Sequence, residues 1–402
     1  MAVTIYDQPQ YLSPAGNPLM FTFSSNQTAQ ENFSFIVEVY VNSVLHSTHQ
    51  VFRQSETMSK FDCSGILQST LQSPLIVDGT LATFYDAAIN PYYIKVYEKY
   101  GATPTIQASA TSSGRLAFNG SLRHQDFINW NYLEHSASTT NSLPTTSILW
   151  LTDWPRARRY FLSDDERLFL GIFNTDTGTC QLRVRLYNSS GTQTVTDITN
   201  VSGAKLIVMD VSPSTIIANM AITQANFDAA AYYTIQARAQ GAGAYSGGSE
   251  VFRIDLDREC KRYETKRLHW LNKYGVWDSF TFSLVSVDST SVQSQGYQRE
   301  KGVWDGTSYT YPMYQGERVD YAKRASDELL LNSDWIYESV QQWLVRGLYE
   351  SPIVYLEVEN GTAFEPVKVV NQGYQFKTRR RNGLIQEQVS IERTYTYTSQ
   401  LN

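Results

Sequence analysis

The chain has 402 residues and a formal net charge of −6, and 13% of its residues are aromatic against 18% charged. This length exceeds what one hydrophobic core usually serves, so two or three domains are expected. The acidic balance argues against nucleic acid as a direct partner. The high aromatic share, to which 27 tyrosines contribute most, suits sheets and wet interfaces.

The cysteines and the N-terminal segment indicate in which cellular compartment the protein is made. Three widely separated cysteines, Cys63, Cys180 and Cys260, predict neither a disulfide framework nor a metal site. Residues 1–10 lack the basic and apolar regions of a signal peptide, and no apolar run has membrane-spanning length. We therefore expect a soluble protein made in a reducing cytoplasm, with no membrane partner.

The first predicted domain, residues 1–112, opens with alternating apolar residues. Residues 33–41 have an apolar side chain at every second position, so these side chains share one face of a strand. Asn42-Ser43 can then turn the chain into a returning strand. Residues 62–71 predict a short helix with Asp62 as its N-cap. The pattern indicates a β-sandwich of the immunoglobulin or fibronectin type.

The second predicted domain, residues 113–289, continues in strands. Asn119-Gly120 is a strong hairpin signal, and in residues 180–187 leucine and valine alternate with arginine. Residues 268–284 predict a hairpin of large aromatic side chains that turns around Gly275. We expect a second β-sandwich with this hairpin in its core.

The third predicted domain, residues 290–402, contains the one long helical pattern of the chain. Apolar residues recur at helical spacing through residues 333–348, with Ser333 as the expected N-cap and Ser351-Pro352 as the stop. Strands are expected on both sides of it. The fold class is thus mainly β: tandem immunoglobulin- or fibronectin-like sandwiches, then a small α+β domain with one helix on a sheet or half-barrel.

The sequence offers weak candidates for chemistry. Asp164, Asp165 and Glu166 form the densest carboxylate cluster, and a solvated turn explains them better than a catalytic pair. The glycine-rich residues 241–248 lack the Lys-Ser/Thr of a phosphate loop. No catalytic residue, metal ligand set or cofactor is therefore predicted, and a glycan-active enzyme is the least favoured class.

Two basic patches are candidate interaction surfaces. Solvated strand faces or hairpin tips explain them most simply, and acidic surfaces of a partner protein fit an acidic chain better than nucleic acid does. The residues are Lys261, Arg262, Lys266 and Arg267 in the first patch, and Arg379, Arg380 and Arg381 in the second.

Two tryptophans share a local sequence. Trp277 and Trp304 both lie in Gly-Val-Trp-Asp, at 275–278 and 302–305, and both segments predict turns. We expect these two side chains to be exposed contact residues, whereas Trp270 and Trp343 occupy core positions of a strand and a helix.

Three segments, residues 17–35, 268–282 and 333–356, resemble parts of virion structural proteins of tailed bacteriophages, with the nearest likeness to tail or neck proteins of crAss-like and related phages of Bacteroidetes. The resemblance implies a virion component that forms a ring around the portal–tail axis, and it brings no catalytic residues with it.

The resulting hypothesis is a non-enzymatic structural subunit of a phage tail, neck or baseplate, located in the virion and assembled in the host cytoplasm. Its expected partners are copies of itself in a ring and other tail, portal or neck proteins. The alternative is a receptor- or carbohydrate-binding module on the virion.

Overall fold

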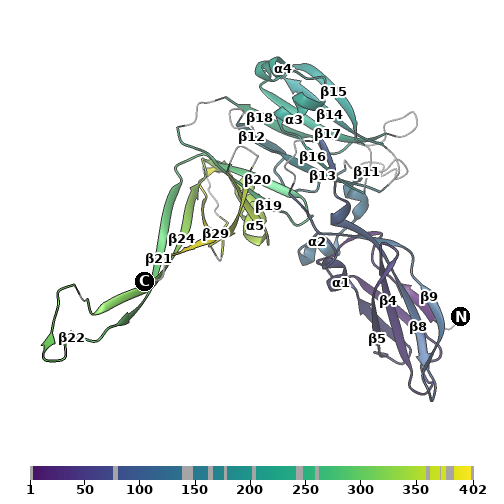
Figure 1. The fold of residues 1–402 in the computed structure, drawn as a ribbon. Coiled ribbons are helices and arrows are strands. Elements are labelled where there is room, and N and C mark those ends of the chain that lie inside the picture. The colour runs from purple at the N-terminus through teal and green to yellow at the C-terminus, as the bar shows by residue number, and fades with distance from the viewer. Residues whose placement is uncertain are drawn as a thin grey trace. The chain divides into compact units, whose positions relative to one another are not determined.

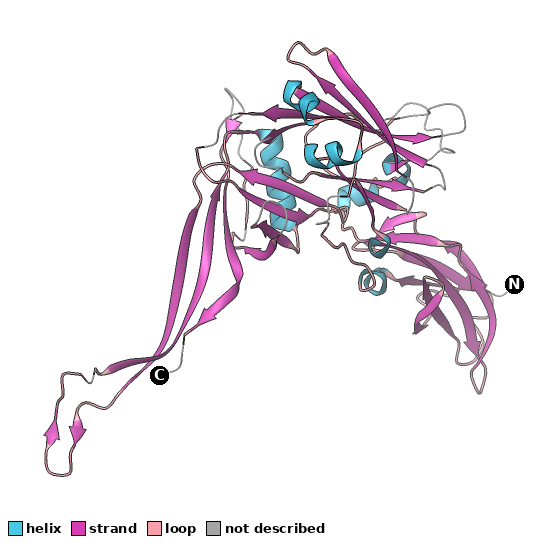
Figure 2. Cartoon of the chain, turned by 45° about the horizontal axis from the view of Figure 1, so that its top comes forward, coloured by secondary structure: helices cyan, strands magenta, loops and turns pink. Residues whose placement is uncertain are grey.

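A computed structural model describes residues 3–75, 80–137, 148–161, 166–175, 179–201, 205–240, 248–258, 262–314, 316–358, 363–371, 373–376 and 384–399. The chain divides into two compact units. The first comprises residues 1–259 and 271–279, and the second comprises residues 260–270 and 280–402. Strands dominate both units (Figures 1 and 2), which confirms the mainly β class. None of the described helices is long and apolar enough to cross a membrane.

The first unit begins with a β-sandwich. A three-stranded sheet packs against a six-stranded one, and their facing side chains form one apolar core. The predicted alternation is confirmed, because Phe35, Val37 and Val39 are all fully buried. Its strands are β1 (Val3–Asp7), β3 (Met20–Ser25) and β6 (Met58–Asp62) in one sheet, and β2 (Leu12–Pro14), β10 (Arg115–Phe118), β8 (Ile89–Tyr100), β4 (Ser34–Val41), β5 (Val44–Val51) and β9 (Thr105–Thr111) in the other.

Two local predictions in this sandwich meet different outcomes. Asn42 and Ser43 have φ of 52° and 66° and turn β4 into β5, as predicted. The short helix α1 (Ser64–Gln68) has Cys63 rather than Asp62 at its N-cap. The Asp62 carboxylate instead accepts hydrogen bonds from the backbone N–H groups of Leu19 and Ser64, both at 2.9 Å, and so joins the helix start to a neighbouring strand.

The rest of the first unit is built on two further sheets. In β14 (Thr179–Tyr187), Leu182, Val184 and Leu186 are buried as predicted. The sheets are β11 (Ser136–Ala137), β13 (Phe169–Asn174), β16 (Leu206–Asp210) and β7 (Ala82–Phe84), and β12 (Ala157–Phe161), β18 (Phe252–Asp257), β17 (Tyr232–Gln240), β14 (Thr179–Tyr187) and β15 (Gln193–Val201). The short helices are α2 (His124–Ile128), α3 (Pro213–Asn219) and α4 (Gln224–Ala229), with 3-10 turns η1 (Asp86–Ala88) and η2 (Tyr132–His135).

The first sandwich and the later sheets of this unit each contain a strand from the other side of the expected domain border at residue 112. β10 follows that border in sequence, yet it pairs with β8 and β2 of the first sandwich. β7 precedes the border, yet it pairs with β16 of the later sheet. The Asn119-Gly120 pair makes no hairpin, which corrects that prediction: the Asn119 N–H donates to the Ala88 carbonyl, and the chain continues into α2.

The tip of the hairpin between β19 (Lys266–Leu271) and β20 (Trp277–Phe282), residues 271–279, is packed into the first unit. Asn272 Nδ2 donates to the Leu151 carbonyl at 2.9 Å, and Trp277 Nε1 donates to the Pro74 carbonyl at 3.0 Å. Gly275 has φ of +75°, and a Cβ added there would lie 1.9 Å from the Asn119 carbonyl oxygen. Only glycine fits both the backbone conformation and the space.

We expect Gly275→Ala to destabilise the chain far more than Gly306→Ala. Both glycines have positive φ, but nothing lies within 4 Å of a Cβ built at Gly306. The Gly306 substitution should therefore cost about 1–2 kcal/mol, from backbone conformation alone. Urea unfolding monitored by circular dichroism measures both, and equal losses would contradict the packing of this tip.

In its described residues, the second unit is a seven-stranded sheet with one helix, α5 (Glu338–Glu350), packed on it (Figure 1). The Trp343 ring lies 5.1 Å from the ring of Trp270, centroid to centroid, and a Cβ at Gly347 would meet Trp270 Nε1 at 2.4 Å. In order across the sheet, the strands are β20 (Trp277–Phe282), β19 (Lys266–Leu271), β26 (Val354–Glu357), β27 (Phe364–Val369), β29 (Gln388–Thr398), β24 (Arg318–Asn332) and β21 (Val287–Gln298). Two small ribbons complete it: β22 (Val303–Trp304) with β23 (Tyr309–Thr310), and β25 (Ile336–Tyr337) with β28 (Leu384–Ile385).

The helix begins later than predicted. Its N-cap is Tyr337, and Ile336–Tyr337 forms a strand instead of the first turn. Ser333 is buried, and its hydroxyl accepts a hydrogen bond from the Glu387 N–H at 2.8 Å. It therefore links the end of β24 to the start of β29 and does not cap the helix. Ser351 is the C-cap, in agreement with the predicted stop.

Candidate functional site: an exposed hairpin arm

The second unit carries a long hairpin that we call the arm, residues 287–332. It consists of β21 and β24, joined through the small ribbon of β22 and β23, and it extends from the seven-stranded sheet in Figures 1 and 2. All twelve residues of β21 are exposed. β29 also pairs with β24 from Arg324 to Asn332, and beyond that the described arm narrows to two strands. Because a two-stranded ribbon is marginally stable in water, this distal part is suited to contact with another molecule.

The distal end of the arm, residues 302–314, is an aromatic tip. Trp304 is 59% exposed, Tyr311 74%, Met313 103% and Tyr314 85%. The ring centroids of Trp304 and Tyr309 are 6.5 Å apart, and those of Tyr309 and Tyr311 are 5.7 Å apart. An apolar and aromatic cluster at the end of a projecting hairpin marks a contact surface, because isolated chains seldom leave such clusters uncovered.

Local hydrogen bonds order this tip without any partner. The Asp305 carboxylate accepts from the backbone N–H groups of Thr307 and Ser308, at 2.8 and 2.7 Å. These bonds to Ser308 and Thr307 lower the pKa of Asp305, so the carboxylate stays ionised at neutral pH. Gly302 and Gly306 supply the positive φ values of the turn. The aromatic side chains are therefore presented on a preformed turn, which reduces the entropy cost of binding.

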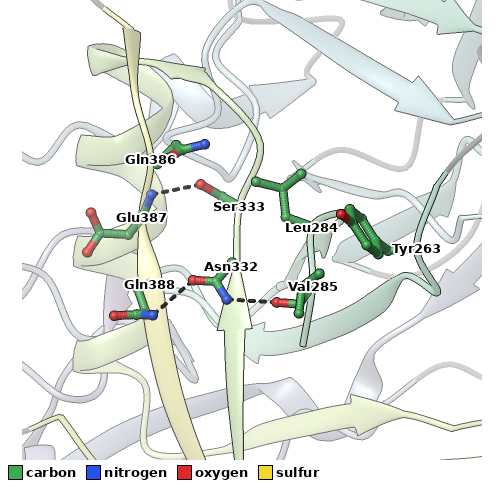
Figure 3. Close-up of a pocket in the computed structure, with 8 residues that line it drawn as sticks. All are labelled: Tyr263, Leu284, Val285, Asn332, Ser333, Gln386, Glu387 and Gln388. Carbon is green, nitrogen blue, oxygen red and sulfur yellow. Dashed lines mark hydrogen bonds between the residues drawn. The ribbon is translucent and has the colours of Figure 1, made fainter. Parts of the chain in front are cut away.

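A groove of about 510 Å³ lies at the base of the arm (Figure 3). Asn332 donates to the Val285 carbonyl at 2.7 Å and accepts from Gln388 at 3.0 Å. These bonds join β24 to β29 and to the segment between β20 and β21. The amides of Asn332 and Gln388 therefore hold the base of the arm in place. The lining residues are Tyr263, Leu284, Val285, Asn332, Ser333, Gln386, Glu387 and Gln388.

The predicted basic patch at 261–267 does not form one surface. Arg262 is exposed, with its guanidinium 5.6 Å from the Tyr263 ring, and Lys266 pairs with Glu264 at 2.6 Å. Arg267 is only 5% exposed, which corrects its assignment to the patch. Both faces of β19 are covered, since every residue from Arg267 to Leu271 is buried. Lys261 and the second patch, Arg379, Arg380 and Arg381, lie outside the described residues.

Arg267 belongs instead to a buried charged cluster in the second unit. Its Nη1 lies 2.6 Å from Glu357 Oε1, and His269 Nε2 lies 2.7 Å from Glu357 Oε2. Burial alone would raise the pKa of Glu357, but the hydrogen bond from His269 and the charge of Arg267 lower it on balance. The cluster joins the neighbouring strands β19 and β26.

The two Gly-Val-Trp-Asp segments have opposite environments. Trp277 is 1% exposed, so the expectation that it is a surface residue is wrong. Its neighbour Asp278 is also buried and accepts from the Thr152 hydroxyl at 2.9 Å. Trp304 is exposed, as expected. Its role in contact stays a prediction.

The carboxylate cluster near 164 is placed only in part, since Asp164 and Asp165 lie outside the described residues. Glu166 is 1% exposed and pairs with Arg158, whose guanidinium stacks 4.0 Å from the Trp154 ring. A solvated turn was expected for Glu166, and burial of this ion pair corrects that. Within the described ranges no group of three His, Cys, Asp or Glu side chains could hold a metal ion.

The arm itself was not predicted from the sequence. One signal could have revealed it: residues 287–298 contain β-compatible residues with a single charge, Asp288, and lead into the aromatic turn at 302–314. This signal is weak because the segment is mostly Ser, Thr and Gln and has no clear apolar face. Hydrophobic periodicity therefore does not identify it as a strand.

Comparisons with known proteins add little. No protein-family model matches the chain, and no curated protein sequence matches it. Among solved structures, it is similar to the FN1–FN3 domains of chicken CNTN1, at 11% identity over 63% of this chain and 67% of that one, with a TM-score of 0.18. A biofilm-associated protein BSP domain matches at 8% identity over 81% of this chain and 62% of that one, also with a TM-score of 0.18. Scores this low carry no argument about role.

Proposed function

We propose that this chain is a non-enzymatic structural subunit of a phage tail, neck or baseplate, and that its copies assemble into a ring. The observation that supports it best is the arm, whose tip exposes a preordered aromatic cluster to solvent. Aromatic residues dominate the energetics of protein interfaces, and they do so from surfaces poor in charge. The virion location and the partners, other tail, portal or neck proteins, rest on the resemblance of three sequence segments.

The proposal is tested by removing the tip's side chains while keeping its turn. Tyr311→Ser combined with Tyr314→Ser should abolish rings in negative-stain images, and leave folding intact because both side chains are more than 70% exposed. Phe52→Ser is the matched control, since Phe52 is an exposed aromatic residue, at 65%, in the first unit. A chain that stays monomeric at high concentration and is absent from purified virions would contradict the proposal.

A second candidate function is glycan recognition by the same tip. Trp304, Tyr309 and Tyr311 form a row of neighbouring rings, and aromatic faces stack on sugars. Binding to a glycan array that is lost in Trp304→Ala would favour this function over subunit contact, and a blank array would exclude it for the glycans displayed.

A further inference from the structure

β21 is the outer strand of the seven-stranded sheet, and its described residues pair with β24 alone. Such edges are normally protected by charged side chains, prolines or bulges. β21 has one charged residue in twelve, Asp288, and no proline. The bulge in the arm lies on β24, because Gln295 and Gly296 face Ala322 and Asp320 and leave Tyr321 extra.

Charge is distributed in the opposite way on the neighbouring inner strand. β24 carries six charged residues in its fifteen, although it is already paired on both sides along much of its length. The edge strand β21, which is open to pairing, therefore has far fewer protecting charges than the inner strand β24. These six residues are Arg318, Asp320, Lys323, Arg324, Asp327 and Glu328.

An apolar row crosses the arm and stops at this edge. Val292 faces Ala325 on β24, and Ala325 faces Tyr397 on β29, so the three side chains share one face. Val292 is 60% exposed and Tyr397 65%. The row ends at Val292 with no neighbour on the open side.

We infer that β21 pairs antiparallel with β21 of a second copy of this chain, about a two-fold axis at Val292. In this register Val292 faces its own counterpart, and the row extends without interruption across six strands. Thr290 then faces Ser294, and Asp288 faces Gly296, so no like charges meet. A shift by one residue would place Val292 opposite Gln293 and break the row.

This inference rests on the proposed multi-copy function and specifies one of its contacts. A two-fold contact is self-complementary and closes on itself, so alone it makes pairs. A ring then needs a second contact to join the pairs, and the aromatic tip is available for it. Such a ring would have dihedral symmetry.

Cysteine cross-linking tests the register on the full-length chain. The background carries Cys260→Ser, since Cys63 and Cys180 are buried. Val292→Cys should give covalent dimers on mild oxidation, because residues directly opposite have Cβ atoms about 4.5–5.5 Å apart. Thr290→Cys and Ser294→Cys should each stay monomeric on a non-reducing gel, because each lies about 13 Å along the strand from its own copy. Mixing these two variants should give the heterodimer.

A charge variant gives an independent readout. Val292→Lys places two ammonium groups opposite each other and should weaken dimerisation at least tenfold in sedimentation, whereas Gln298→Lys, at the strand end, should not. Oligomers without a Val292→Cys cross-link, or a cross-link between Val292→Cys and Tyr397→Cys chains, would overturn the inferred pairing and leave the multi-copy function standing. A monomer at every concentration would overturn both.

Discussion

Replacing Glu357 with glutamine is expected to lower the free energy of unfolding of the second unit by about 3–5 kcal/mol. Glu357 lies between Arg267 and His269, and the two charged side chains of the ion pair are 5% and 4% exposed. Glutamine keeps the volume but removes the charge, so the buried Arg267 guanidinium loses the carboxylate that faces it at 2.6 Å. Urea unfolding at pH 7, followed by circular dichroism, measures the loss.

The neighbouring surface pair provides the control. Lys266 and Glu264 are joined at 2.6 Å, but Glu264 is 80% exposed, so Glu264→Gln should change stability by less than about 1 kcal/mol. A loss of equal size in the two variants would show that burial does not govern the Glu357 cluster.

Acid should weaken the contribution of Glu357. Its pKa is lowered in the folded state, so the carboxylate stabilises the fold fully above the unfolded value, about 4.3. That contribution is lost as pH falls through the folded pKa. The stability difference between the wild type and Glu357→Gln should therefore be largest near neutral pH and shrink in acid. A difference that stays constant from pH 7 to pH 3 would contradict this linkage.

Trp277→Ala is the second substitution with a large expected effect, a loss of about 3–5 kcal/mol from the first unit. The indole is 1% exposed and donates to the Pro74 carbonyl at 3.0 Å. Alanine would leave a cavity in place of the buried indole and would remove its hydrogen bond to the Pro74 carbonyl. Thermal and urea unfolding give the loss of stability.

Trp304→Ala is the matched variant, because Trp304 lies in the same four-residue sequence, Gly-Val-Trp-Asp. Its side chain is 59% exposed, so stability should change by no more than about 0.5 kcal/mol. The two variants should thus separate in stability even though the local sequences are identical. Similar losses would show that the arm tip packs against its own chain.

The strands of this chain were largely readable from its sequence. The alternation through 33–41 and 180–187 places apolar side chains on one face, and burial in the structure follows it closely. The stop of the long helix at Ser351 was also local information, because proline at 352 restricts the residue before it. Its start was not, since Ser333 is engaged by Glu387, a residue far away in the sequence.

Local sequence determined the form of the two Gly-Val-Trp-Asp turns, and tertiary structure decided their environments. Gly275 and Gly302 both adopt positive φ, near +75° and +78°, as their shared sequence allows. Trp277 is nevertheless core and Trp304 is surface, because burial depends on whether distant segments, here Pro74 and Asn119, pack around the turn. The mainly β class and most strand faces therefore follow from residue periodicity alone. The exposed arm and the buried Arg267–Glu357 pair are decided by which strands pair across the chain, and hydrophobic periodicity does not specify that pairing.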